Sequence, residues 1–184
     1  MGRSADRTRM KLLAAATAEF AEYGISGARI DRIAERAEVN KRMIYAYYGN
    51  KEQLFERVVE QSLEELLDAI PIQPDDLPEY AGQLFDYLVA HPERRRLSLW
   101  RLLERPAQTP PELRSHQTKH DVLAGARAHD TDLDARSLLV FIMAIVQAWP
   151  NTVGSPTAPS GPELAAQRAS VVEAVRRLTT PGVS

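Results

Sequence analysis

The chain has no cysteine among its 184 residues, which excludes a disulfide framework and thiolate chemistry. It also has no apolar run of the roughly 18–20 residues that a membrane-spanning helix needs. The best candidate, residues 137–149, is shorter than that and is expected to be a buried helix. The basic, polar N-terminus shows no signal peptide. Together these absences predict a cytoplasmic protein that has no membrane partner.

The sequence also lacks the motifs of common enzymes. It contains no nucleophile elbow, phosphate-binding glycine loop or dinucleotide-binding fingerprint, so an enzyme would need an unfamiliar all-helical site. His116 and His120 have the four-residue spacing that can clamp a metal ion, and Asp121 and His129 are nearby. Neither a cysteine nor a Glu-x-x-His context accompanies them, however. We therefore expect no catalytic residue, no metal ion and no cofactor.

Net charge is small, at −2, but the two signs are unevenly distributed. Residues 1–51 hold ten Lys and Arg against six Asp and Glu, which gives +4, whereas residues 52–184 hold thirteen against nineteen, which gives −6. A basic N-terminal segment suits contact with a polyanion, and the acidic remainder does not. Because charge fluctuates along any chain, this asymmetry favours a nucleic-acid partner only in combination with other features.

Apolar residues recur at three- and four-residue steps along most of the chain, and no convincing alternating strand pattern is present. Gly24 offers an end to the first helix, Asn40 an N-cap to a short helix, and Asn50 with Gln53 a capping box to the next. The sequence thus predicts an all-α protein of about nine helices. They are expected over residues 8–24, 28–39, 41–48, 77–90 and 92–104, with others opening at Asn50, Thr109, residues 131–134 and Ser160.

The second and third predicted helices have the pattern of a helix-turn-helix. A tight turn over residues 37–40 joins them, and apolar residues on both sides of the turn can pack together: Ile33, Ala34, Ala37, Val39, Ile44 and Tyr48. In this motif the first helix braces the second, whose exposed N-terminal side enters the DNA major groove. That groove is only about 12 Å wide, so a helix of a few turns is sufficient.

The side chains that flank the apolar face of residues 41–48 suit contact with DNA. Arg42 could form a bidentate pair with a guanine, and Lys41 could act as a point charge on a phosphate or base. Tyr45 and Tyr47 can rest their rings on the scaffold while their hydroxyls reach phosphate oxygens or base edges. Lys51, in the first turn of the next helix, can attract a phosphate together with the helix dipole. The alternative is a solvated basic helix beside a tyrosine-rich core.

The segment over residues 28–55 resembles the N-terminal domain of tetracycline-repressor-type (TetR family) transcriptional regulators. The family pattern has Ile-Ala in the second helix, Ala-Gly-Val at the turn, a Leu/Ile-Tyr-x-His/Tyr-Phe tract, and then Lys and Leu. This chain matches it over about residues 8–55 with Ile33-Ala34, Ala37-Glu38-Val39, Ile44-Tyr45-Ala46-Tyr47-Tyr48, Lys51 and Leu54. The resemblance implies a sequence-specific DNA-binding regulator, a repressor in particular, that is not an enzyme.

Two residues depart from the family pattern. Arg29 stands where the family favours a Thr that caps the second helix and touches a phosphate; arginine can reach a phosphate but cannot cap. Glu38 replaces the turn glycine, at a cost of roughly 1 kcal/mol if the backbone is left-handed there. The residues expected to contact double-stranded DNA are therefore Arg29, Lys41, Arg42, Met43, Tyr45, Tyr47 and Lys51.

Two domains are expected: residues 1–50, with the helix-turn-helix at about 29–48, and residues 51–184, for ligand binding and dimerisation. One short reading helix contacts few base pairs, so such modules usually dimerise on a pseudo-palindrome. The predicted eighth and ninth helices are the best candidates for a homodimer interface, because the eighth is apolar nearly all round. The family resemblance implies the same pair of helices. The alternative is that the eighth helix is only the central core helix of its domain.

The resemblance also implies a small-molecule cavity among the fifth to eighth helices, whose occupancy releases the protein from its operator. The candidate lining residues are aromatic, apolar or histidine side chains: Phe85, Leu88, Trp100, Leu103, His116, His120, Phe141 and Trp149. The alternative for each of them, which the sequence favours, is ordinary core. From the helix over residues 92–104, Leu97, Trp100 and Leu103 are expected to face inward. Two other functions stay open, namely an all-helical small-molecule-binding or enzymatic protein with an incidental helix-turn-helix, and a helical scaffold for protein partners.

Overall fold

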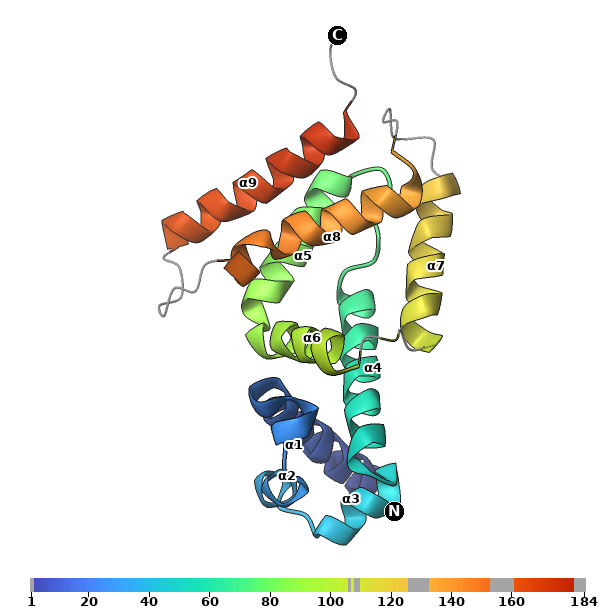
Figure 1. Ribbon diagram of the computed structural model, residues 1–184, viewed down its shortest axis with the longest axis vertical. Helices are drawn as coiled ribbons and strands as arrows, with labels where there is room; N and C mark the ends of the chain where they lie inside the picture. The colour runs from blue at the N-terminus through green and yellow to red at the C-terminus, as the bar shows by residue number, and fades with distance from the viewer. Residues whose placement is uncertain (1, 106, 108–109, 126–132, 153–160, 181–184) are drawn as a thin grey trace. The chain divides into compact units, whose positions relative to one another are not determined.

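The computed structural model describes residues 2–105, 107, 110–125, 133–152 and 161–180, and within these ranges every regular element is an α-helix. The nine described helices confirm the all-α prediction (Figure 1). They are α1 Gly2–Gly27, α2 Ile30–Ala37, α3 Lys41–Tyr48, α4 Lys51–Ala69, α5 Leu77–Ala90, α6 Pro92–Glu104, α7 Pro110–Gly125, α8 Ala135–Thr152 and α9 Gly161–Thr179. Among the described helices, none combines the length and the apolar character needed to cross a membrane.

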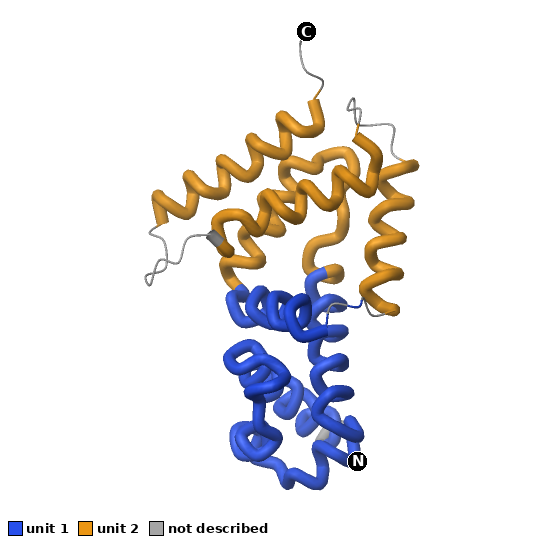
Figure 2. The backbone as a smooth tube through the Cα atoms, viewed as in Figure 1, with its two compact units in different colours: residues 1–66, 91–109 blue, residues 67–90, 110–184 orange. Residues whose placement is uncertain are grey.

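The chain forms two compact units that interleave along the sequence (Figure 2). Unit 1 comprises residues 1–66 and 91–109, and unit 2 comprises residues 67–90 and 110–184. This division differs from the boundary expected after residue 50, because most of α4 and all of α6 pack with the N-terminal helices. The chain therefore passes between the units three times, first within α4.

The core of unit 1 is built from one face of each of its first four helices. Buried residues include Leu12, Ala16 and Phe20 of α1, Ile33 of α2, Ile44 of α3, and Leu54 and Phe55 of α4. The rings of Phe20 and Phe55 meet edge to face with their centroids 5.1 Å apart. Burial of each such side chain is worth about 1.5–3 kcal/mol, so this cluster fixes the short helices α2 and α3 against two longer ones.

The break in α1 at Gly24 is held by α6. Gly24 has φ 67° and ψ −179°, and an added Cβ would lie 2.9 Å from Cε3 of Trp100. Beyond the break, the backbone N–H groups of Ile25 and Ser26 donate to the Glu104 carboxylate at 2.6 and 3.3 Å. The indole of Trp100 donates to the carbonyl of Ala21 at 3.2 Å. Glu104 thus satisfies backbone donors that the interrupted helix leaves without an intrahelical acceptor.

The polar character of this contact corrects one prediction about α6. Leu103, expected to face inward with Leu97 and Trp100, is instead 74% exposed. Leu97 is buried as expected, and Trp100 is partly buried. The inner side of α6 carries Glu104 rather than Leu103 because its partner is the backbone of α1 beside Gly24.

In unit 2, α9 packs closely against α5. A Cβ added at Gly82 of α5 would lie 2.8 Å from the guanidinium of Arg168 and 3.0 Å from Cγ2 of Val172, both on α9. Arg168 donates to Asp86 at 2.7 Å and to Glu79 at 2.9 Å, so its charge is neutralised by two carboxylates of α5. The missing side chain at Gly82 is therefore what allows this ion-paired arginine to lie across α5.

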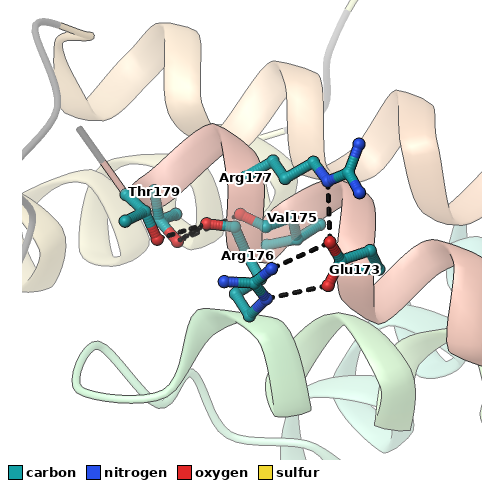
Figure 3. Close-up of polar contacts among 6 residues, drawn as sticks. Glu173, Val175, Arg176, Arg177 and Thr179 are labelled. Carbon is teal, nitrogen blue, oxygen red and sulfur yellow. Dashed lines mark hydrogen bonds and ion pairs between the residues drawn. The ribbon is translucent and has the colours of Figure 1, made fainter. Parts of the chain in front are cut away.

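The C-terminal end of α9 carries an exposed ion-pair cluster (Figure 3). Arg176 donates to both oxygens of Glu173 at 2.8 Å, and Arg177 donates to Oε1 of the same carboxylate at 2.7 Å. These hydrogen bonds lower the pKa of Glu173 to about 2. The two cations also lie in the last turn of the helix, where its dipole favours positive charge.

Candidate nucleic-acid interface

The turn between α2 and α3 is fixed by hydrogen bonds on both sides. Glu38 adopts φ 57° and ψ 39°, which is the left-handed backbone that a glycine would occupy without strain. The N–H groups of Glu38 and Val39 donate to the carbonyls of Glu35 and Ala34 at 3.1 and 3.0 Å. On the other side, Asn40 Oδ1 accepts from the N–H of Arg42 at 2.8 Å and confirms the predicted N-cap.

The side chain of Glu38 has a role of its own in the turn. Its carboxylate accepts from the ammonium of Lys11 in α1 at 2.9 Å, and this hydrogen bond lowers the pKa of Glu38. Both groups are exposed, so the pair contributes little to stability. The contact neutralises the carboxylate at the turn between the two helices.

Burial confirms that α2 braces α3. Ile33, Ala34 and Ala37 of α2 and Ile44 of α3 are buried in the core of unit 1. Val39 and Tyr48 are partly buried and pack against the same cluster, as the sequence pattern predicts. The opposite side of α3 is consequently left to solvent. We refer to this exposed side, which carries Lys41, Arg42, Tyr45 and Tyr47, as the reading face.

The reading face carries cations and tyrosine hydroxyls. Arg42 is exposed, and Tyr45 and Tyr47 are 44% and 38% exposed. Lys41 forms an exposed ion pair with Asp31 of α2 at 2.7 Å, and the hydrogen bond to Asp31 raises the pKa of Lys41. Met43 is only partly buried. Because an exposed ion pair contributes little, Lys41 can exchange Asp31 for a phosphate at small cost.

Arg29 and Lys51 lie at the starts of α2 and α4. Within the described chain, the Arg29 side chain makes no capping hydrogen bond at α2, as expected for an arginine in place of the family's threonine. Its backbone N–H donates instead to Glu19 of α1 at 2.9 Å. The ammonium of Lys51 donates to the carbonyl of Ala28 at 3.4 Å, so it lies beside the residues that precede α2.

Two residues that contact the helix-turn-helix were not among the DNA-contacting residues predicted from the sequence. Glu19 is buried, caps α2 through the Arg29 N–H, and also accepts from Nε of Arg32 at 2.7 Å. Its position next to Phe20 on the apolar side of α1 is a sequence signal for a buried carboxylate with specific partners. The guanidinium of Arg9 lies 5.7 Å from the centroid of the Tyr47 ring. No local spacing rule connects Arg9 with a residue so distant in the sequence.

The predicted ligand residues are divided between the two units. Trp100 and Leu103 belong to unit 1, and the other six belong to unit 2: Phe85, Leu88, His116, His120, Phe141 and Trp149. Phe85 is buried and Leu88 is partly buried, whereas His116, Phe141 and Trp149 are exposed. Nδ1 of His120 lies 3.2 Å from Oδ1 of Asp121, which is exposed. His129, the other possible metal ligand, lies outside the described residues, and the described ones contain no three-residue metal cluster.

Two family models match this sequence. Residues 12–58 match the model of bacterial regulatory proteins of the tetR family. Residues 76–177, more than half of the chain, match the tetracyclin repressor-like C-terminal domain. The first match contains the whole of α2, the turn and α3, which is the part whose geometry is that of a helix-turn-helix.

Individual proteins agree with the family models. The chain is 48% identical over 102 residues to the HTH-type transcriptional repressor SCO4008 of Streptomyces coelicolor, which covers 55% of this chain and 53% of that protein. It is 41% identical over 96 residues to the HTH-type transcriptional repressor NicS of Pseudomonas putida, covering 48% and 45%. These matches span about half the length of each curated relative.

A solved structure extends the similarity to nearly the full chain. The crystal structure of a protein assigned as the transcriptional regulator SCO4942 of Streptomyces coelicolor superposes with a TM-score of 0.78 and 35% identity. It covers 92% of this chain, which in turn covers 97% of that one. The chain therefore belongs to the TetR family of bacterial regulatory proteins, a family of DNA-binding regulators and not of enzymes.

Proposed function

We propose that this protein is a transcriptional repressor that binds a palindromic operator as a homodimer and is released by a small molecule. The observation that carries the DNA-binding part is the reading face, an exposed row of cations and tyrosines on a helix that a buried core holds rigid. Two relatives that share 41–48% identity over about half of this chain are themselves repressors, which supports repression over activation.

Each proposed DNA-contacting residue, on the reading face or beside it, has a separate role in this proposal. Arg42 pairs with a guanine through two donors, and Lys41 supplies a positive charge to a phosphate or base edge. Tyr45 and Tyr47 donate their hydroxyls to phosphates or bases, and Lys51 binds a phosphate at the start of α4. Arg29 and Met43 complete the contact surface: Arg29 reaches a phosphate, and Met43 contributes apolar contact.

The homodimer is proposed to form through α8 and α9. The buried side of α8 carries Leu138, Leu139, Ile142 and Val146, yet its opposite side is apolar too and remains exposed: Val140, Phe141, Ala144 and Ala148. Val140 is 58% exposed and Phe141 is 44% exposed. A contiguous apolar strip of this kind marks a protein interaction site. On α9 the exposed Ala165, Ala166 and Ala169 would allow close helix contact.

Release by a ligand rests on the family relationship. A ligand weakens operator binding only if it binds the DNA-incompetent arrangement of the dimer more tightly than the competent one. Of the lining residues named from the sequence, the proposal keeps Phe85 and Leu88, because both belong to unit 2, where Phe85 is buried and Leu88 is partly buried.

The test is a titration of the protein against a palindromic duplex, selected from a random-sequence library, and against a scrambled duplex of equal length at several salt concentrations. A repressor of this kind binds the palindrome as a 2:1 complex about 10³-fold or more tighter than the scrambled duplex. A small-molecule-binding protein with an incidental helix-turn-helix selects no duplex. A helical scaffold forms a dimer and binds neither DNA nor metabolites in a thermal-shift screen.

A further inference from the structure

Beside the reading face lies a cleft whose lining is that of an anion site. It has a volume of about 520 Å³ and is bounded by α1, α3 and α4. Its lining residues are Arg9, Leu13, Tyr47, Tyr48, Gln53 and Arg57. Two guanidinium groups, one amide and two phenol rings thus line the cleft, and Leu13 is its aliphatic residue. None of these residues except Tyr47 belongs to the DNA contacts proposed above.

Arg9 is the cation of this cleft that carries uncompensated charge. Its guanidinium stacks over the ring of Tyr47 at 5.7 Å, and among the described residues no carboxylate pairs with it. Arg57, by contrast, donates to Glu60 at 2.9 Å and to Glu64 at 3.3 Å. The stacking holds the Arg9 charge beside a residue of the reading face.

Tyr48 supplies a hydroxyl that packing alone does not require. The Tyr48 ring packs against the core of unit 1, and this packing needs only the ring. Its hydroxyl oxygen is buried and has no hydrogen-bond partner among the described residues, which is unfavourable for a polar group. Burial raises the pKa of Tyr48, so the phenol keeps its proton and remains a donor.

We infer that this cleft binds one phosphate group of the DNA backbone, with the Arg9 guanidinium as its cation and the Tyr48 hydroxyl as a neutral donor. The inference rests on the proposed DNA-binding function and adds a contact that brings in Arg9 of α1 and Tyr48 at the end of α3. A phosphate oxygen accepts from Tyr48 once the side chains that cover its buried hydroxyl shift to admit the phosphate from the cleft. The contact carries no sequence information, so it stabilises operator and scrambled duplex equally.

Salt dependence tests the Arg9 part. Arg9→Gln removes one phosphate-neutralising charge from each protomer, so the slope of log K against log salt becomes shallower by about 0.9 per protomer, or about 1.8 for the dimer, on the operator and the scrambled duplex alike. Arg9→Lys keeps the charge and restores the slope. Arg114→Gln, which removes an exposed arginine of α7 in unit 2, is the charge-matched control and leaves the slope unchanged.

Tyr48→Phe tests the hydroxyl, since it removes that group and keeps the ring. We expect a loss of affinity for both duplexes of about 3- to 10-fold per protomer, with no change of slope, about what one neutral hydrogen bond in each protomer is worth. Unchanged affinity would remove Tyr48 from the site, and an unchanged slope in Arg9→Gln would overturn the proposal. In either case wild-type binding to the operator stands, whereas failure of the wild type to bind any duplex refutes the proposed function itself.

A free phosphate ion is the alternative ligand for the same cleft. In that case inorganic phosphate raises the Tm of the wild-type protein more than chloride at equal ionic strength, Arg9→Gln abolishes the difference, and the DNA slope is unaffected by the substitution. That pattern would assign the cleft to a soluble anion and contradict the DNA contact.

Discussion

One helix in each unit presents a different kind of surface. In unit 1 the exposed side of α3 presents cations and tyrosine hydroxyls, whereas in unit 2 the exposed side of α8 leaves Val140 and Phe141 in solvent. The polar contacts between helices differ as well. In unit 1, Glu19 and Glu104 accept from backbone N–H groups, whereas in unit 2 Arg168 pairs with carboxylates. One unit is suited to a polyanion and the other to an apolar partner.

The largest expected effect tests whether the two units are separate in stability. Phe20 is fully buried in unit 1, so Phe20→Ala should cost about 3–5 kcal/mol of the free energy of unfolding of that unit. The chain has two tryptophans, Trp100 in unit 1 and Trp149 in unit 2. Trp149→Phe and Trp100→Phe backgrounds therefore report each unit separately in urea unfolding followed by fluorescence.

Phe20→Ala should move the Trp100 transition to lower urea and leave the Trp149 transition within about 0.5 kcal/mol, because distant sites are nearly independent. Equal shifts of both transitions would show that the chain unfolds as one cooperative body, and the comparison between the units would then lose its energetic meaning.

Gly82→Val is the corresponding change in unit 2. The new side chain would meet Arg168 and Val172, and overpacking of this kind costs about 1–3 kcal/mol. The Trp149 transition should shift and the Trp100 transition should not. Gly161→Val is the matched control, because a Cβ at Gly161 has no described atom within 4 Å. If Gly161→Val destabilised unit 2 as much, the close approach of α5 and α9 would not be the cause.

Two substitutions separate base reading from phosphate binding within unit 1. Arg42→Ala should lose about 1–3 kcal/mol of discrimination at one base pair, which selection of variant operators would reveal as a relaxed position. Lys51→Ala should weaken binding to every duplex and make the slope of log K against log salt shallower by about 0.9 per protomer, or about 1.8 for the dimer. The assigned roles are wrong if either variant binds both duplexes with the affinity and salt slope of the parent protein.

The smallest expected effect concerns pH and the ion pairs of α9. The pKa of Glu173 is lowered from its ordinary 4.5 to about 2 by hydrogen bonds from Arg176 and Arg177. A carboxyl whose pKa is lowered by folding stabilises the protein fully above pH 4.5, and this contribution is lost as the pH falls toward 2. The Tm difference between wild type and Glu173→Gln should therefore be largest near neutral pH and shrink below pH 4.5.

The same pH series on Glu56→Gln, an exposed glutamate of α4, provides the control. A difference for Glu173→Gln that grows on acidification would have the wrong sign for a stabilised carboxylate and would exclude the ion pairs as its source.

Local sequence signals predicted much of the fold because caps and prolines act over a few residues. The bounds of α3, α5 and α6 agree with the structure, and α3 and α6 begin at the Asn40 cap and at Pro92. The left-handed backbone of Glu38 followed from its place at the family's turn glycine. The reading face followed from periodicity on one short helix.

What the sequence did not predict depends on contacts between distant residues. Glu19 caps α2 from α1, and Glu104 caps the restarted helix beyond Gly24 from α6. The apolar spacing of α6 predicted that Leu103 faces inward. In the structure α6 meets backbone N–H groups of α1, which Glu104 accepts from, and Leu103 is exposed. The expected ligand residues were chosen by residue type, and they divide between two units that are not continuous in sequence.

The most direct test of the reading face is photo-crosslinking from defined positions. A photoreactive phenylalanine analogue such as benzoylphenylalanine, introduced at Tyr47, should cross-link to the operator duplex, and unlabelled operator should compete the product away. The same analogue at Phe141, exposed on α8, should give no DNA product and should instead cross-link two copies of the chain. A duplex that binds the protein but is cross-linked from Phe141 and not from Tyr47 would contradict the account.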